Sequence, residues 1–205
     1  MGVMHIDPCE LEPLAAYKLA TSIIVPRPIA WVGSRSLEGC DNLAPFSYFM
    51  GVSTNPPSIA ISIARGRKGM LKDSASNILS TKEFTVSVVS YDLSEKMVAS
   101  SKSWSSEVSE FDAVGLTVKE SDLINAPRPA ESLVSMECSL VHVHDMQSTH
   151  LMVGEVLRYH LNERIVLTDE KGHRTVDVRG VNPVGRLGGY EYCLINDSFS
   201  LKAQK

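Results

Sequence analysis

A basic loop that runs into a helix start is the first candidate for chemistry in this sequence. Residues 65–74 read RGRKGMLKDS. The first N–H groups of a helix have no internal partner and the helix dipole is positive there, so such a start attracts anions. Arg65 and Lys72 can add positive charge, and Ser74 can add a hydroxyl donor. The spacing is that of neither a P-loop nor a dinucleotide-binding loop. The stretch predicts a site for a phosphate group; a basic loop that only contacts solvent is the alternative.

The strand pattern directly before this loop alternates between large and small side chains. Residues 58–64 read SIAISIA. Successive side chains of a strand point to opposite faces, so the three isoleucines share one face and Ala60, Ser62 and Ala64 share the other. The small face fits close packing against a neighbouring strand. Beside the basic loop, it also fits a flat ligand that lies close to the backbone.

A third stretch, GCDNLAPFSYFMG at residues 39–51, is an apolar strand pattern that other residues interrupt. Asn42 and Ser47 add amide and hydroxyl groups, and Ala44 fills little space. Pro45 has no N–H to donate, so this strand must lie at a sheet edge or carry a bulge. Backbone groups freed in this way can face a ligand. Together, the three stretches predict a planar heteroaromatic ligand with polar edges and a phosphate tail.

Strands outnumber helices in the pattern of the whole chain. Strands are predicted over residues 29–34, 42–50, 58–64, 84–90, 135–144, 151–159 and 165–167. Helices are predicted over residues 73–80, with Asp73 or Ser74 as N-cap, over 92–100, with Asp92 in a capping-box variant, and over 105–111. This order favours a mainly β fold, a β-barrel with short helical insertions, over a doubly wound sheet.

Composition limits the class of protein. The 205 residues are 43% hydrophobic, which fits a single domain over residues 1–205. The net charge of −4 at pH 7 argues against a nucleic-acid partner. The sequence has no apolar run that could cross a bilayer and no signal-peptide pattern, so we expect a cytoplasmic protein without a membrane partner. The four cysteines form no CxxC pair, which favours free thiols over disulfides or a zinc site.

Nine segments resemble, in the same order, the flavin reductase-like FMN-binding family, whose fold is a split β-barrel of the Greek-key type. The PRPIAW opening is similar to the longer branch of that family. The segments are PRPIAWVGS (26–34), NLAPFSYF (42–49), NPPSIAISI (55–63), LKDSASNI (71–78), EFTVSVV (83–89), SEFDAVGLT (109–117), SMECSLVHV (135–143), HLMVGEVL (150–157) and GRLGGYEY (185–192).

The resemblance implies FMN as cofactor, with NADH or NADPH as co-substrate. It implies no catalytic side chain, because hydride would pass directly from the nicotinamide to the flavin. His150 falls where it could lie on the nicotinamide side. The residues implied to bind the cofactor are Trp31, Ser34, Asn42, Ala44, Pro45, Phe46, Ser47, Tyr48, Ser62, Ala64, Arg65, Lys72, Asp73, Ser74 and His150.

The resemblance also implies a homodimer with the flavin near its interface. The downstream partner would be a monooxygenase or another electron acceptor. Two other functions stay open at this point. One is a flavoredoxin-like electron carrier that holds FMN and reacts little with NAD(P)H, and the other is a non-enzymatic split-barrel binding protein.

Three further residues call for an interpretation. His142 and His144 share one face of a predicted strand, but no carboxylate or cysteine lies at a metal-ligand spacing from them, so we predict no metal site. Arg186 could meet the phosphate of a second nucleotide, and the alternative is a structural residue that closes the barrel.

Overall fold

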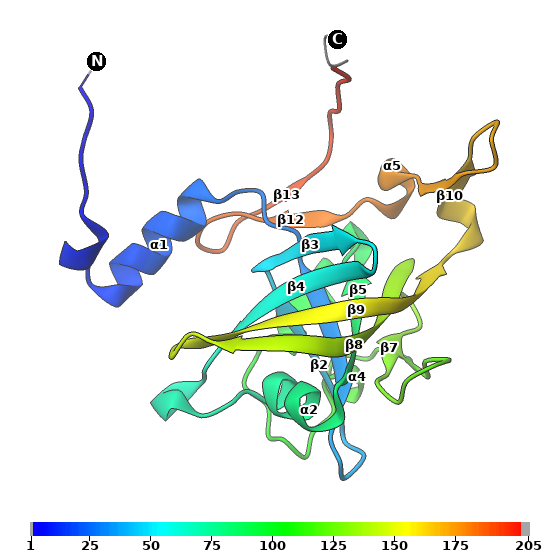
Figure 1. Cartoon of the computed structure of the whole chain (residues 1–205), viewed down its shortest axis with the longest axis horizontal. Coiled ribbons are helices and arrows are strands. Elements are labelled where there is room, and N and C mark those ends of the chain that lie inside the picture. The colour runs from blue at the N-terminus through cyan, green and yellow to red at the C-terminus, as the bar shows by residue number, and fades with distance from the viewer. Residues whose placement is uncertain (1, 202–205) are drawn as a thin grey trace.

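A computed structural model describes residues 2–201 of the chain. Its centre is a seven-stranded antiparallel sheet in the order β2-β1-β5-β8-β9-β4-β3 (Figure 1). The seven strands are β1 (Ala30–Arg35), β2 (Asp41–Phe46), β3 (Phe49–Thr54), β4 (Pro57–Ala64), β5 (Glu83–Val88), β8 (Val134–Asp145) and β9 (Thr149–Leu161).

The connection between β2 and β3 explains why this sheet curls into a barrel. β2 and β3 are neighbours in the sequence but lie at opposite edges of the sheet. Only Ser47 and Tyr48 separate them, so three Cα–Cα steps lead from the end of β2 to the start of β3, and these reach about 11 Å at most. The two edges must therefore come close together. A backbone hydrogen bond of 2.8 Å from Ser62 of β4 to the carbonyl of Tyr48 holds this corner.

Short elements surround the barrel. Three two-stranded ribbons pair β6 (Val118–Lys119) with β7 (Arg128–Pro129), β10 (Val166–Thr168) with β11 (Arg174–Val176), and β12 (Val184–Arg186) with β13 (Tyr192–Leu194). The α-helices are α1 (Pro13–Ile23), α2 (Asp73–Thr81), α3 (Ser94–Ser100), α4 (Glu110–Ala113) and α5 (Val178–Val181). Short 3₁₀ turns are η1 (Pro8–Glu10), η2 (Arg67–Gly69), η3 (Tyr91–Leu93) and η4 (Glu163–Ile165). Figure 1 shows α1 projecting from the barrel and α2 lying across its opposite end.

The alternation of β1 supplies two apolar cores at once. Ala30 and Val32 point into the barrel, where they pack with the isoleucines of β4 and with Phe84 and α2. Trp31, one position along, points to the other face and packs with α3 and α4. Both sets are buried. The barrel core therefore holds α2 against β1 and β2, and the outer core holds α3 and α4 against β2.

The mainly β fold with short helical insertions is confirmed, and so is the position of Pro45 on an edge strand. The predicted strand over residues 42–50 is wrong, because the chain turns at Ser47 and Tyr48 and leaves one sheet edge for the other. The predicted helix over residues 105–111 is also wrong: helix α4 begins only at Glu110 and residues 105–109 are irregular.

Both predicted N-caps are wrong as well. The N-cap of α2 is Lys72 and that of α3 is Leu93, and neither forms a side-chain capping bond. The hydroxyl of Ser74 instead accepts a hydrogen bond from Asn42. Helix α1 was not foreseen. Within residues 2–201, no helix has both the length and the apolar character that crossing a bilayer requires.

Candidate functional site

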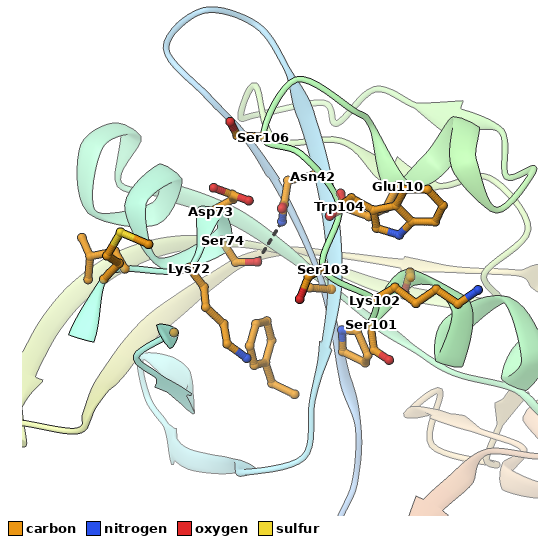
Figure 2. Close-up of a pocket in the computed structure, with 17 residues that line it drawn as sticks. Asn42, Lys72, Asp73, Ser74, Ser101, Lys102, Ser103, Trp104, Ser106 and Glu110 are labelled. Carbon is orange, nitrogen blue, oxygen red and sulfur yellow. Dashed lines mark hydrogen bonds between the residues drawn. The ribbon is translucent and has the colours of Figure 1, made fainter. Parts of the chain in front are cut away.

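A cavity of about 400 Å³ lies between edge strand β2 and the start of α2 (Figure 2). Residues 42 and 44–46 of β2 form one side, and residues 70–74 form the second. The third side is the segment between α3 and α4, which carries Lys102 and Trp104, together with Glu110 at the start of α4. The cavity therefore joins two of the three stretches that the sequence predicts to bind a ligand, residues 42–47 and 65–74.

The start of α2 is the part of this cavity with free backbone donors. Since no side chain caps the helix, its first N–H groups are available to an external acceptor. The Lys72 side chain adds positive charge, and its Nζ lies 5.7 Å from the centre of the Phe46 ring. The carboxylate of Asp73 stands in the same first turn and offsets part of that charge. Lys102 also lines the cavity, but its ammonium group points away from the helix start (Figure 2).

Asn42 connects the two sides of the cavity. Its amide nitrogen donates to Ser74 Oγ at 2.8 Å, the bond dashed in Figure 2, and to Ser34 Oγ at 3.3 Å. Asn77 donates to the same Ser34 hydroxyl at 3.2 Å. These bonds engage the N–H groups of Asn42 and leave its amide oxygen as the group available to a ligand. Asn42 thus fixes the helix start relative to β2.

Glu110 is a cavity residue that the sequence reasoning missed. Its side chain is buried, and burial raises its pKa above the ordinary value, while a 2.9 Å bond from the Leu43 N–H opposes the rise. A raised pKa increases the fraction of the acid that can donate a hydrogen bond. Glu110 and Asn42 therefore give the cavity polar groups beside the apolar Ala44 and Phe46.

The segment of residues 100–106 was missed too. It reads SSKSWSS and carries Trp104, which lines the cavity with 36% of its surface exposed. Such a stretch has neither strand nor helix periodicity, so its serines indicate a loop and nothing in the pattern indicates a site. Trp104 adds an aromatic side chain to the same lining that holds Phe46 and Lys72.

Seven of the predicted residues line the cavity: Asn42, Ala44, Pro45, Phe46, Lys72, Asp73 and Ser74. Trp31 and Ser34 lie behind it and are fully buried. The indole N–H of Trp31 donates to the Ser100 hydroxyl at 3.0 Å, so Trp31 would act through its neighbour rather than by contact. Ser47 and Tyr48 lie at the corner beyond β2, outside the lining of this cavity.

The remaining predicted residues gather at the β8–β9 hairpin. The Ser62 hydroxyl bonds Thr149 at 2.8 Å, and Ala64 is the last residue of β4. Arg65 donates to Asp145 and to the Gln147 carbonyl, both at 2.8 Å.

Arg65 Nη2 also lies 3.2 Å from His150 Nε2. The other ring nitrogen of His150, Nδ1, is buried without a hydrogen-bond partner among the described residues. None of these residues lines the cavity, and their flavin contacts stay a prediction.

One cluster of metal-ligand residue types occurs away from the cavity. Asp122, Glu137 and His160 bring one ligand atom each to within 4.8 Å of one another. Glu137 is fully buried, and it accepts bonds from the N–H groups of Asp122 and Leu123 at 2.8 Å and contacts His160 Nε2 at 2.5 Å. Asp122 pairs with Arg158 at 2.6 Å. These contacts account for all three side chains as a structural network. His142 and His144 are exposed on β8.

The family model of the flavin reductase like domain matches residues 22–175. A relative in Aquifex aeolicus, itself uncharacterised, is 40% identical over 176 residues, which are 86% of this chain and 88% of the relative.

Two solved structures are similar over almost their whole length. Component B of nitrilotriacetate monooxygenase from Bacillus cereus is 32% identical with a TM-score of 0.90, covering 98% of this chain and 100% of that chain. The 2-nitrobenzoate 2-nitroreductase of Pseudomonas fluorescens is 32% identical with a TM-score of 0.87, covering 98% and 96%. The fold is the split barrel, the domain named for a further similar structure, a flavin reductase from Shewanella frigidimarina with a TM-score of 0.83. The chain belongs to the flavin reductase-like family.

Proposed function

We propose that this protein binds FMN and transfers hydride to it from NADH or NADPH, so that reduced flavin or its electrons reach a downstream acceptor. The observation that carries the proposal is the cavity between β2 and the uncapped start of α2, because it combines an anion site with apolar and amide groups. A flavin mononucleotide has these three parts: a phosphate, a flat ring and polar ring edges. The residues present therefore fit the cofactor.

Each part of the cavity has a role in this proposal. Lys72 and the N–H groups of α2 would hold the phosphate, and Asn42 would offer its amide oxygen to a ring-edge or ribityl donor. Ala44 leaves room for a flat ring beside β2. FMN, when bound, supplies the hydride-accepting chemistry, and the protein binds and orients the two reactants. No side chain needs to act as acid or base for such a transfer.

The component B relative favours a partner for this chemistry. That protein is one component of nitrilotriacetate monooxygenase, and the other relative is a reductase of 2-nitrobenzoate. We infer that this protein, a single unit over residues 1–205, acts in the cytoplasm and delivers its electrons to a partner enzyme or a small acceptor.

We also propose a homodimer with the flavin near its interface. The edge strand β3 exposes Met50 and Val52 at 60% and 51%, and helix α1 exposes Leu14, Tyr17 and Ile23. An exposed edge strand with apolar side chains is a surface that proteins normally cover. A second copy of the chain would cover it in a closed twofold arrangement. Light scattering of Val52→Lys should then show a smaller mass than the unchanged protein.

The test of the hydride-transfer proposal is the visible spectrum of the purified protein, loaded with FMN if necessary, during addition of NADH and then NADPH without air. We expect the absorbance of oxidised flavin to bleach with at least one donor. A flavin spectrum that persists with both would contradict the reductase and support the flavoredoxin-like carrier. A protein that takes up no FMN at all would support a non-enzymatic binding protein.

A further inference from the structure

A second, smaller pocket adjoins the main cavity and shares Pro45, Phe46 and Ser101 with it. Its volume is about 200 Å³, whereas pockets for drug-sized ligands span about 300–1,000 Å³. The pocket therefore fits a single-ring molecule and is too small for a dinucleotide. Its other lining residues come from α1, from the residue before β1, from α3 and from the β12–β13 ribbon, and include Tyr17, Ile29, Met97, Arg186 and Tyr192.

The lining combines apolar side chains with one cation and with the hydroxyl groups of two serines and two tyrosines. Ile29, Met97 and Phe46 are buried and give an apolar surface on which a ring can pack. Among the described residues that line the pocket, Arg186 is the one with a charge. Apolar side chains beside a single guanidinium, with hydroxyl groups around them, suit a ring that carries one carboxylate.

Two hydrogen bonds hold the Arg186 guanidinium in place and leave some of its N–H donors free. One terminal nitrogen donates to the Tyr192 hydroxyl, and the other donates to the carbonyl of Gly189. Its central carbon lies 4.5 Å from the centre of the Tyr192 ring. These bonds use two of the five N–H donors of the side chain. The remaining donors can meet a planar carboxylate.

A second arginine fixes the sides of this pocket relative to each other. Arg27 is 4% exposed, and its guanidinium donates to the carbonyls of Thr21 and Ile24 at 2.6 Å and to that of Leu187 at 2.8 Å. Its backbone also exchanges two hydrogen bonds with Arg186, of 3.0 and 2.8 Å. Arg27 thus joins the end of α1 to the C-terminal ribbon. The pocket is therefore preformed, and little free energy is lost in ordering its side chains when a ligand binds.

We propose that this pocket binds a single-ring carboxylate, with Arg186 as the partner of the carboxylate and with Phe46 and Met97 against the ring. The binding is a property of the chain and does not need FMN. Only the further statement that this ligand lies beside the flavin rests on the proposed function.

Isothermal titration calorimetry on the full chain tests this site, with benzoate and its neutral analogue benzamide as probes. We expect benzoate to bind at least about tenfold more tightly than benzamide, because only the carboxylate gains a charge-assisted bond. Arg186→Gln should abolish that preference. Arg179→Gln removes the same charge from the neighbouring helix α5, outside the pocket, and should keep it. Circular dichroism checks that both variants are folded.

Three results would overturn the proposal. Equal binding of benzoate and benzamide would mean that the pocket takes a neutral ring, such as a nicotinamide. Benzoate binding that survives Arg186→Gln would place the carboxylate elsewhere, and no benzoate binding would remove the site altogether. The comparison of the two probes uses the unchanged protein, so the proposal can still be refuted if the Arg186→Gln variant fails to fold.

A parallel titration with FMN separates this proposal from the previous one. Arg186→Gln should bind FMN as the unchanged protein does, since Arg186 does not line the main cavity. If the unchanged protein binds benzoate but no FMN, the proposed function fails while the carboxylate site stands. If it binds FMN and shows no preference for benzoate, the reverse holds.

Discussion

Replacing Lys72 with methionine tests the anion site at the start of α2. Methionine keeps an apolar side chain against Phe46, which the Lys72 ammonium faces at 5.7 Å, and removes only the charge. A hydrogen bond to a charged group contributes about 1.5–3 kcal/mol when protected from water. Lys72 is exposed, so solvent screening reduces this to about 0.5–1 kcal/mol. The expected loss of FMN affinity is therefore about 2- to 5-fold.

The assay is titration of the chain with FMN, followed by quenching of flavin fluorescence, with riboflavin as the matched ligand that lacks the phosphate. Lys72→Met should weaken FMN and leave riboflavin unchanged. Lys171→Met removes an exposed lysine in the distant β10–β11 hairpin and should change neither. A variant that loses both ligands equally, or neither, would refute the placement of the phosphate at α2.

Three further changes test the cavity and the barrel. Ala44→Asp places a charge where the flat ring is proposed to lie, and should abolish retention of FMN while circular dichroism stays unchanged. Leu37→Asp, in an exposed turn, is the control. An Ala44→Asp protein that is still yellow would contradict the site. Gly154→Ala would bring a methyl group within 2.4 Å of the buried Phe84 ring, so urea denaturation should show a loss of about 1–3 kcal/mol, and unchanged stability would contradict the packing. Burial alone would raise the pKa of Glu137, but its three hydrogen bonds outweigh burial and hold the pKa below the ordinary value of 4.5. The carboxylate therefore stabilises the fold above that pH, and this stabilisation is lost as the pH falls below it. Glu137→Gln should be less stable at neutral pH and lose less on acidification, and thermal melts from pH 7 to pH 3 measure both; a variant as stable and as acid-sensitive as the unchanged protein would contradict this role.

The sequence predicted those parts of the fold and site that local periodicity specifies. The alternation of SIAISIA gave β4 with its isoleucines in the barrel core, and the RGRKGMLKDS stretch gave the helix start that borders the cavity. Pro45 correctly indicated an edge strand, because a missing N–H is tolerated where no neighbouring strand needs it.

The rest depended on tertiary contacts that the local pattern does not contain. Glu110 reaches the cavity from a position 67 residues away from its partner Leu43. The serine-rich segment before it carries no periodicity. The hydroxyl of Ser74 looked like a helix cap, but the folded chain uses it to bond Asn42 of β2. The break at Ser47 and Tyr48 follows from barrel closure and not from any property of those two residues.

A crystal structure of the chain grown with FMN tests the central claim most directly. We predict the phosphate at the first turn of α2 beside Lys72 and the ring along Ala44 and Phe46 of β2. Flavin bound at any other place, or a cavity that stays without flavin at saturating FMN, would contradict the account.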